Sequence, residues 1–451
     1  MMPKTTFAIL MVMALISCTT HPNSTAQAQT SVSAQTFEGN ELHFIAGEFR
    51  AKWTVSNTED KQWKIEDRFP LITEQQLLFL EVKKGIQRVS AIELDKLVTI
   101  QPGSLLFEKG AYPVRGRNHQ TAPKSGFGRK EAASPMVVAM YPGNVVREED
   151  EGGRQSLKAL FDGNPISTAA PIRDYLKIRE TEWLVYPQSV EMRSSGSKTK
   201  IFQCHDVFSI DVQNNIIAVG YRDKDNQSRV CVWKRKRNNL QNCDCNNALI
   251  SLKDAVNPVL SQDGYYLAVG EHKQEGTWNL KVGAIKTFQN KAVLVPDIRL
   301  HDIKNKKVFY QNSYAWLGHT LFFTKGNMPS KLYQISCPDQ HCKDHQPIQF
   351  PKMISVCGVR TWASSQTQSQ SNLLILKYIN KKLSEKNDYP LWFPAAKNCS
   401  PNDEKKYEMT SIKWGQPFLV DGKPYLATEA RLKFMGTGGR IITRILVFAI
   451  Q

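Results

Sequence analysis

The chain has 451 residues, and its 59 lysines and arginines outnumber its 42 aspartates and glutamates to give a formal net charge of +17. The length leaves room for one large or two ordinary domains, and an apolar content of 41% excludes a wholly disordered chain. The basic surplus indicates either attraction to polyanions, such as acidic glycans, anionic lipid head groups or nucleic acid, or a highly charged surface that keeps the protein soluble.

The N-terminus has the organisation of an export signal. Lys4 supplies a positive start, and Phe7 to Ile16 form an unbroken apolar run that is too short to span a bilayer. The run leads into Leu15-Ile16-Ser17-Cys18, which resembles the lipobox of bacterial lipoproteins. The resemblance implies that residues 1–17 are a signal peptide and that Cys18 is acylated. The alternatives are ordinary secretion, with a cleavage site at Ala26-Gln27-Ala28, and an uncleaved anchor.

Residues 18–37 are expected to form a lipidated, flexible tether. Thr19 to Thr36 contain no Asp, Glu, Lys or Arg and are rich in Ser, Thr, Gln and Ala, so they bury too little apolar surface to offset their ordering entropy. A coil of this length reaches roughly 20–25 Å. In Gram-negative lipoproteins an aspartate after the acylated cysteine implies inner-membrane retention, and Thr19 therefore implies the outer membrane.

Residues 38–195 are predicted to form an irregular β-rich region. Apolar runs between Gly, Pro and Asn breaks predict strands at 42–49, 77–82, 97–100, 136–141 and 183–186, and short helices at 155–161 and 172–178. Between Lys109 and Lys130 lies a basic stretch without acidic residues, which indicates either an anion-binding loop or a solvated one. Its candidate anion-binding residues are Arg115, Arg117, Lys124 and Arg129.

Residues 196–451 repeat a pattern of turn and strand. Asp211 to Asn215 lead into the apolar run Ile216 to Gly220, and Ser261 to Gly264 lead into Tyr265 to Gly270 about fifty residues later. Self-similarity at this period, in units made of strands, indicates a radial or solenoid array. We place the units at 200–253, 256–299, 309–354, 355–402 and 408–451.

The second unit carries the clearest motif. Pro258-x-x-Ser261-x-Asp263-Gly264 followed by Leu-Ala-Val resembles the repeat of TolB-type and related WD-repeat-like β-propellers. The resemblance implies an all-β fold, a β-propeller of six or seven blades, to which residues 38–195 add one or two blades. The last strand, Ile441 to Ile450, has no downstream partner, and an open apolar edge invites aggregation. We therefore expect a strand of the N-terminal region to pair with it.

Alternation along Tyr265 to Gly270 places Tyr265, Leu267 and Val269 on one face of a strand, and Tyr266, Ala268 and Gly270 on the other. Such a strand suits sheets packed face to face. Tryptophans recur in step with the units and are interpreted as packing between sheets, with carbohydrate binding as the alternative. They are Trp316, Trp362 and Trp414.

Cysteine usage indicates an oxidising compartment. Nine cysteines minus Cys18 leave an even number, as a disulfide framework requires: Cys204, Cys231, Cys243, Cys245, Cys337, Cys342, Cys357 and Cys399. The first four are expected to staple one blade, and Cys337 and Cys342 to form a local bridge. The alternative is a metal site, because thiolate and imidazole ligands suit zinc. Its ligands would be Cys337, His341, Cys342 and His345.

A second basic cluster follows a predicted strand and falls at a hairpin tip. It contains Lys234, Arg235, Lys236 and Arg237, and it indicates either a solvated turn or a contact for phosphate or an acidic sugar.

The sequence has none of the motifs H-E-x-x-H, G-x-S-x-G, P-loop or strand-to-helix G-x-G-x-x-G. We therefore assign no catalytic residue and no cofactor. The sequence favours a lipid-anchored envelope protein that binds or scaffolds a protein, an anionic glycan or lipid head groups, and we expect no nucleic acid partner. The alternatives are a propeller enzyme, such as a glycan lyase or hydrolase or a peptidase, with its site at the central channel, and a structural subunit of a larger envelope assembly.

Overall fold

The structure is a computed structural model. It describes residues 35–48, short segments between 64 and 167, and then 174–235, 241–272, 278–298, 314–325, 331–357 and 392–451 with gaps of one or two residues. Strands dominate this part of the chain, which confirms the all-β fold class. The helices among these residues are α2 (Leu94–Val98), α3 (Phe288–Lys291) and the 3-10 turns η3 (Ile285–Thr287) and η4 (Pro338–Gln340). Within the described ranges, no helix combines the length and apolarity that a membrane span requires.

The first half of the chain builds three antiparallel sheets. Sheet I contains β2 (Lys64–Ile65), β3 (Leu71–Ile72), β4 (Gln76–Lys83), β5 (Ile86–Glu93) and β6 (Tyr112–Arg115). Sheet II contains β7 (Met136–Tyr141), β8 (Asn144–Glu151), β9 (Arg154–Ala159) and β10 (Pro165–Ser167). Sheet III contains β11 (Asp174–Ile178), β12 (Thr181–Tyr186), β13 (Ser189–Ser194), β14 (Ser197–Gln203) and, parallel to β14, β18 (Gln241–Asn242).

The next three sheets follow the repeat units. Sheet IV contains β15 (Asp206–Gln213), β16 (Ile216–Arg222), β17 (Ser228–Lys234) and β19 (Ile250–Lys253). Sheet V contains β20 (Ala255–Leu260), β21 (Tyr266–His272), β22 (Trp278–Ala284) and β23 (Val293–Ile298). Sheet VI contains β24 (Tyr314–Leu317), β25 (Thr320–Lys325), β26 (Lys331–Ser336) and β27 (Gln346–Pro347). Among the described residues, strand pairing joins it to sheet V at one position, Ile298 opposite Lys325, and we divide the continuous sheet there.

Sheet VII combines strands from both ends of the chain. It contains β28 (Met353–Cys357), β30 (Glu404–Val420), β31 (Lys423–Phe434), β32 (Ile441–Ile450), β1 (Leu42–Glu48) and β29 (Trp392–Pro394), in that order. β1 pairs antiparallel with β32, from Leu42 opposite Ile450 to Gly47 opposite Leu446. This confirms the prediction that an N-terminal strand covers the edge of the last one.

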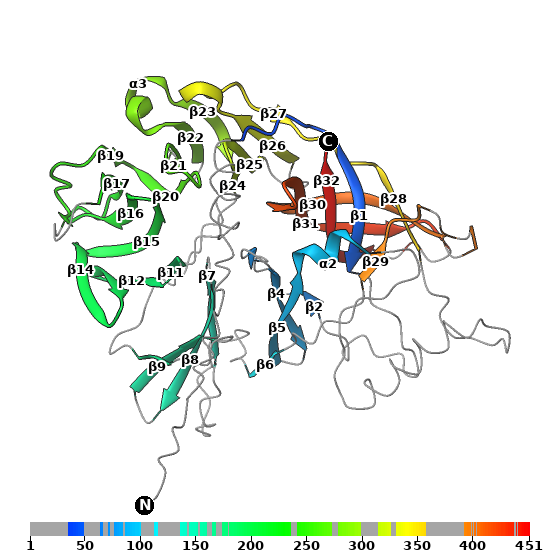
Figure 1. The fold of residues 1–451 in the computed structure, drawn as a ribbon, viewed down its shortest axis with the longest axis horizontal. Helices are drawn as coiled ribbons and strands as arrows, with labels where there is room; N and C mark the ends of the chain where they lie inside the picture. Colours follow the sequence, from blue (N-terminus) through cyan, green and yellow to red (C-terminus); the bar gives the residue numbers. More distant parts are fainter. Residues whose placement is uncertain are drawn as a thin grey trace, which may run out of the picture.

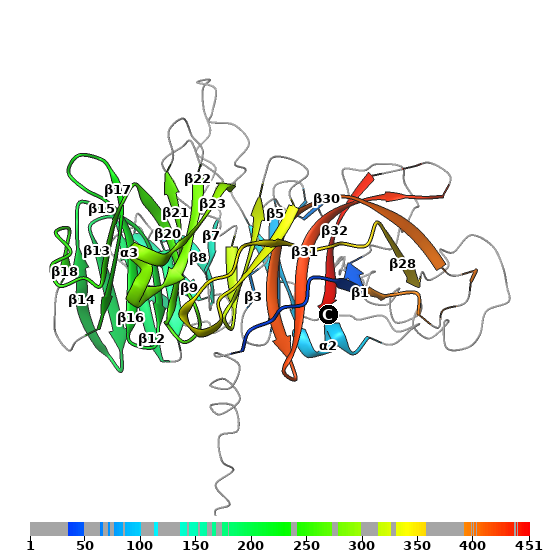
Figure 2. The same ribbon diagram turned by 90° about the horizontal axis from the view of Figure 1, so that it is seen from above.

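The sheets follow one another around a ring (Figure 1). β11 lies against β15, β15 against β20, β20 against β24 and β24 against β30. β3 of sheet I touches β30, β6 touches β7 of sheet II, and β7 and β8 touch β11, so the circuit returns to sheet III. Seen from above, the strands of sheets III to VI stand side by side (Figure 2). The described strands thus form a β-propeller of seven sheets, within the predicted six or seven blades.

Burial on both faces explains how neighbouring sheets pack where the structure describes their side chains. On β21, Leu267 and Val269 belong to the core shared with sheet IV, whereas Tyr266 and Ala268 belong to the core shared with sheet VI. The exposed Tyr265 precedes the strand. The predicted alternation is therefore confirmed for Tyr266 to Val269, and it gives each of these side chains an apolar environment on its own face.

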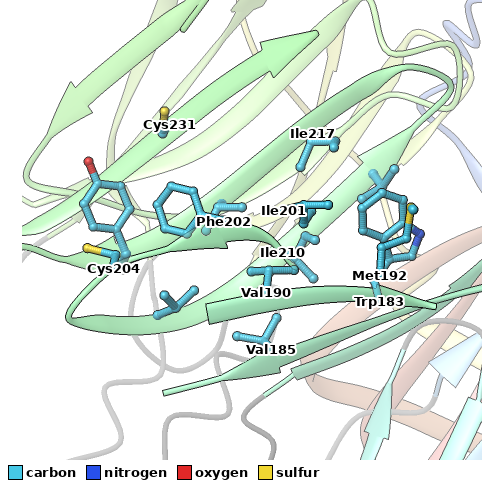
Figure 3. Packing of buried hydrophobic residues seen from close by; sticks show 14 of the residues in the cluster. Trp183, Val185, Val190, Met192, Ile201, Phe202, Cys204, Ile210, Ile217 and Cys231 are labelled. Carbon is cyan, nitrogen blue, oxygen red and sulfur yellow. The ribbon is translucent and has the colours of Figure 1, made fainter. Parts of the chain in front are cut away.

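The other cores repeat this arrangement. Sheets III and IV enclose Trp183, Phe202, Ile210, Ile217 and further apolar side chains (Figure 3). On β32, Leu446 and Phe448 face the core with sheet VI, whereas Ile445 and Val447 face the core with sheet I and α2. Trp316 is buried in the core between sheets V and VI and donates its ring N–H to the Val259 carbonyl at 3.1 Å, which confirms the packing interpretation for this residue. Trp362 and the side chain of Trp414 lie outside the described residues.

Several predicted elements are wrong. The segments predicted as helices at 155–161 and 172–178 contain β9 and β11, because sheet pairing with β8 and β12 outweighs weak local helix preference. Residues 97–100 end α2 instead of forming a strand. Most of the unit placed at 355–402 lies outside the described residues, so this unit stays a prediction; its described strands, β28 and β29, belong to sheet VII. Residues before 196 supply sheets I and II and most of sheet III, more than the one or two blades expected, and the boundary at 195/196 falls in the β13–β14 turn.

Candidate functional site at the turn end of sheets IV to VI

Three hairpin turns gather at one end of neighbouring sheets. They are the β15–β16 turn at Asn214, the β20–β21 turn at Ser261 to Tyr265 and the β24–β25 turn at His319. The Asn214 side-chain amide donates to the Asp263 carbonyl at 2.8 Å, and a ring nitrogen of His319 hydrogen-bonds to the Asp263 carboxylate. We call this end of the three sheets the turn end.

The β20–β21 turn is built by its own side chains. Ser261 Oγ donates to Asp263 Oδ1 at 2.6 Å, and the same oxygen accepts the Tyr265 amide at 3.0 Å. Ser261 Oγ in turn accepts the Tyr266 amide at 3.0 Å. Gly264 has a φ of +73°, a conformation that a residue with a Cβ adopts only with strain. The Ser-x-Asp-Gly sequence therefore determines the local conformation.

Asp263 links this turn to the next sheet. Burial by itself raises the pKa of the Asp263 carboxyl, but hydrogen bonds from His319, Ser261 and the Tyr265 amide outweigh it and lower that pKa below its usual value. The ring of Tyr266 meets the His319 ring edge-on, with 4.8 Å between centroids. The carboxylate is thus ionised at neutral pH and holds sheets V and VI together.

The arrangement contains serine, histidine and aspartate but not the geometry of an acyl-transfer site. A nucleophilic serine needs its hydroxyl hydrogen-bonded to the histidine and open to substrate. Ser261 is fully buried and donates to Asp263 instead. The group therefore acts as an inter-sheet link.

The predicted local bridge lies at the same end. Cys337 and Cys342 are joined in a disulfide around η4, and the Gln340 amide donates to the Tyr266 hydroxyl at 3.0 Å. A disulfide removes both thiolates from the alternative metal site with His341 and His345. Across the described ranges, no group of three or more His, Cys, Asp or Glu side chains could hold a metal ion.

The N-terminal segment crosses this end before it enters β1. The His319 amide donates to the Gln35 carbonyl at 2.8 Å, and Thr320 Oγ1 accepts the Phe37 amide at 2.8 Å and donates to the Phe37 carbonyl at 2.9 Å. Ser336 Oγ donates to the same carbonyl at 3.3 Å. The predicted tether, which ends at residue 37, therefore meets the fold at the turn end.

Exposed basic side chains lie at the same end of sheets IV and V. The Arg235 amide donates to the Asn215 carbonyl at 2.7 Å, and its guanidinium lies 5.5 Å from the centroid of the Trp183 ring. Lys286 follows Ile285, whose amide donates to the Tyr265 carbonyl at 2.8 Å, so it too lies at the turn end. The basic cluster of the turn end is Lys234, Arg235, Lys286 and Lys291, all exposed.

Two disulfides involve cysteines of the connection between β17 and β19, which follows Lys234. Cys231 of β17 is bonded to Cys245, and Cys204, between β14 and β15, is bonded to Cys243. The Tyr221 hydroxyl also donates to the Cys243 carbonyl at 2.9 Å. The four cysteines therefore join sheets III and IV, where a single stapled blade was expected.

The positions of the remaining predicted site residues stay predictions. Cys18, Arg117, Lys124, Arg129, Lys236 and Arg237 lie outside the described residues, and Arg115 ends β6 with only its backbone described. Sequence reasoning missed His319, Thr320 and the docking of Gln35 and Phe37. A histidine after a turn glycine carries no periodic or motif signal that would mark it.

No protein-family model matches the chain, and no curated protein matches it. Solved structures that resemble it include the β-propeller domain of Cps50 (Swd1) from Myceliophteria thermophila, with 9% identity over 86% of this chain and 100% of that one, at a TM-score of 0.34. The WD40 domain of Toxoplasma gondii coronin has 8% identity over 93% and 89%, at a TM-score of 0.40. TolB from Acinetobacter baumannii has 11% identity over 60% and 67%, at a TM-score of 0.34. Similarity at this level carries no information about ligands or activity.

Proposed function

We propose that this protein is a lipid-anchored binding or scaffold protein of the bacterial cell envelope, acylated at Cys18 and attached to the outer membrane. Its turn end faces the anionic head groups, and the opposite end of the ring binds a partner protein. The observation that supports this orientation is the position of Gln35, which is hydrogen-bonded to His319 at the same end of the sheets as the basic cluster.

Reach and charge are consistent with this orientation. The sixteen residues between Cys18 and Gln35 (19 to 34) span roughly 20–25 Å as a coil, which keeps the turn end within reach of the bilayer surface. A lysine or arginine at an anionic membrane surface contributes about 1 kcal/mol. At the turn end Asp263 is engaged by His319 and Glu38 by Lys343, and the exposed Asp339 offsets only part of the charge of the four exposed cations.

The ring leaves few surfaces for a partner. Both faces of the central sheets are buried, so strand ends and connections are what the molecule presents. With the turn end held toward the lipid, the connections at the opposite end, including Asp223 to Gln227 between β16 and β17, face away from the membrane. This is the surface on which we place the partner.

The anchor is tested by metabolic labelling with a clickable fatty acid. The full chain is expected to incorporate label and to fractionate with the envelope, and Cys18→Ala to lose both properties. Label retained in Cys18→Ala, or recovery of the unlabelled native chain from the cytosol, would refute the anchor.

The orientation is tested separately with the unacylated Cys18→Ala chain. Its binding to neutral phosphatidylcholine vesicles measures the contribution of the apolar leader. The increase in binding when anionic phosphatidylglycerol is added measures the contribution of the basic cluster. A turn-end variant carries Lys234→Gln, Lys286→Gln and Lys291→Gln. A control with the same charge change carries Lys224→Gln, Lys253→Gln and Lys331→Gln, exposed lysines of the opposite end.

Three removed cations correspond to about 3 kcal/mol, on the order of a 100-fold loss of the phosphatidylglycerol-dependent gain. We expect this loss in the turn-end variant and little change in the control. Equal losses in the two variants would contradict the orientation and leave the anchor untouched.

A further inference from the structure

Two large apolar side chains are exposed at the turn end. Tyr265 is 56% exposed and Leu249 is 49% exposed, whereas Tyr266, the residue after Tyr265, is 2% exposed. A single exposed apolar side chain is ordinary on a protein surface, but apolar side chains that gather at one place mark a contact surface. The positions of Tyr265 and Leu249 therefore decide what their exposure means.

Tyr265 lies at the tip of the β20–β21 turn. Its amide donates to Asp263 Oδ1 at 3.0 Å, and its carbonyl accepts the Ile285 amide at 2.8 Å. Both of its backbone groups are hydrogen-bonded, so the turn holds the exposed ring at a defined position beyond the end of the strands.

Leu249 lies at the same end of sheet IV. Its amide donates to the Val232 carbonyl at 2.7 Å, and the next residue, Ile250, is paired with Val232 of β17. Continuing this antiparallel register places Leu249 near Trp233, one residue before Lys234. One strand residue corresponds to about 3.3 Å, so Leu249 lies close to the end of β17.

The turns of sheets IV and V touch, which brings the two positions to one surface. The Asn214 side chain donates to the Asp263 carbonyl at 2.8 Å, and a Cβ added to Gly264 would lie 3.1 Å from the Gln213 carbonyl. The two sheets also share a buried core below these turns. Tyr265 and Leu249 thus belong to the same end of one pair of packed sheets.

Exposed cations flank both apolar side chains. Lys234 follows Trp233 at the end of β17, and Lys286 directly follows Ile285, whose amide is hydrogen-bonded to the Tyr265 carbonyl. The turn end of sheets IV and V therefore combines apolar and positively charged groups on one surface.

This combination fits the surface of an anionic bilayer. Interfacial protein surfaces bury their apolar side chains about 5–10 Å into the boundary between head groups and acyl chains, and their cations attract anionic lipid. Tyrosine is enriched at this depth because its ring is apolar and its hydroxyl is polar. The N-terminal segment meets the fold at the same end, where the His319 amide donates to the Gln35 carbonyl at 2.8 Å.

We propose that Tyr265 and Leu249 insert into the interfacial layer of an anionic bilayer while the basic cluster contacts its head groups. The inference rests on the proposed orientation, and it adds an apolar component to an attraction that charge alone would leave sensitive to salt. Burying one large apolar side chain changes affinity by about 10-fold, so the two together contribute about 100-fold.

The first test measures insertion with a tryptophan at the tip. Tyr265→Trp is introduced into the unacylated Cys18→Ala chain, which is bound to excess phosphatidylcholine and phosphatidylglycerol vesicles with brominated acyl chains, and the emission of the parent chain is subtracted. We expect the added emission to move to shorter wavelength and to be quenched. The control is Met435→Trp, because Met435 is 53% exposed in the β31–β32 turn of sheet VII, outside the turn end. Equal quenching of the two added tryptophans would overturn the proposal.

The second test separates insertion from charge. Tyr265→Ser combined with Leu249→Ser is expected to weaken binding to the same vesicles about 100-fold. This loss should persist in ~1 M salt, where a Debye length of about 3 Å screens the cations. The matched control, Met435→Ser with Ile441→Ser, removes two exposed apolar side chains of sheet VII and should change the affinity little.

The outcomes distinguish insertion from orientation. An affinity of the Tyr265→Ser, Leu249→Ser chain equal to that of its control would overturn the insertion. If the turn-end lysine variant still lost its phosphatidylglycerol-dependent gain, the proposed orientation would stand without insertion. If neither variant differed from its control, insertion and orientation would both be wrong.

Discussion

Asp211 connects sheets IV and V through a carboxyl group that is largely removed from water, and replacing it with asparagine tests the packing of the ring. Its Oδ2 accepts the Leu260 amide at 2.6 Å, and its Oδ1 accepts the Val212 amide at 2.8 Å. Burial outweighs these two hydrogen bonds and raises the pKa of Asp211 from 3.8 to about 7. The folded protein therefore holds a proton on Asp211 at a pH where the unfolded chain has released it.

The sign of the pH dependence follows from proton uptake. Between the unfolded and folded pKa values the native state binds more protons, so this residue's contribution to stability is complete below pH 3.8 and is lost as pH rises through about 7. Integrated from about pH 5 to about pH 8, the change in the free energy of unfolding is about 2–3 kcal/mol, as an upper value.

The assay is urea unfolding followed by tryptophan fluorescence at both pH values, for the native chain and for Asp211→Asn. Asparagine does not titrate, so the variant is expected to lose this part of the pH dependence while other groups contribute equally to both proteins. The asparagine side chain has one acceptor oxygen, so it can accept a hydrogen bond from only one of the two backbone amides. The lost bond should lower the free energy of unfolding by about 1 kcal/mol at every pH. An identical change in unfolding free energy from pH 5 to pH 8 in both proteins would refute the reasoning.

Four further substitutions test the links between sheets and the packing within one of them. Asp263→Asn should destabilise the ring, and a double-mutant cycle with His319→Gln should give a coupling energy of about 1–3 kcal/mol; additive effects would contradict the link between sheets V and VI. Tyr314→Phe removes a hydroxyl that donates to a buried carbonyl of β20 and should cost about 1–3 kcal/mol, measured by urea unfolding, whereas an unchanged midpoint would argue against that bond. Gly220→Ala places a methyl group against Ser209 Oγ and 2.6 Å from the Phe208 ring, and it should cost about 1–3 kcal/mol by overpacking. A thermal midpoint at or above that of the native chain would show that these contacts are not tight.

Local chemistry predicted the parts of the fold in which each residue acts on its near neighbours. The Ser261-x-Asp263-Gly264 turn follows from a hydroxyl, a carboxylate and a residue that tolerates positive φ. The alternation on β21 follows because successive side chains point to opposite faces. The pairing of the strand at Ile441 to Ile450 with an N-terminal strand was predictable as well, because an apolar edge strand requires a partner.

Long-range pairing was beyond sequence reasoning. Residues 174–178 form β11 because β12 lies beside them, and nothing in their own composition indicates this. The inter-sheet pair of Asp263 and His319 joins residues 56 positions apart, and the docking of Phe37 on Thr320 joins residues 283 apart. Such contacts depend on the angle between sheets, which no local pattern encodes.

The sequence by itself determined that the chain is built of strands with two buried faces, that its cysteines are numerous and even once Cys18 is set apart, and that its charge is strongly basic. Only the tertiary structure decided that seven sheets meet in a ring and that the N-terminal segment meets the fold at the same end of the sheets as the basic cluster. The physical reason is that hydrophobic alternation specifies which side of a strand is buried, whereas the neighbour that buries it is selected by packing and pairing over the whole chain.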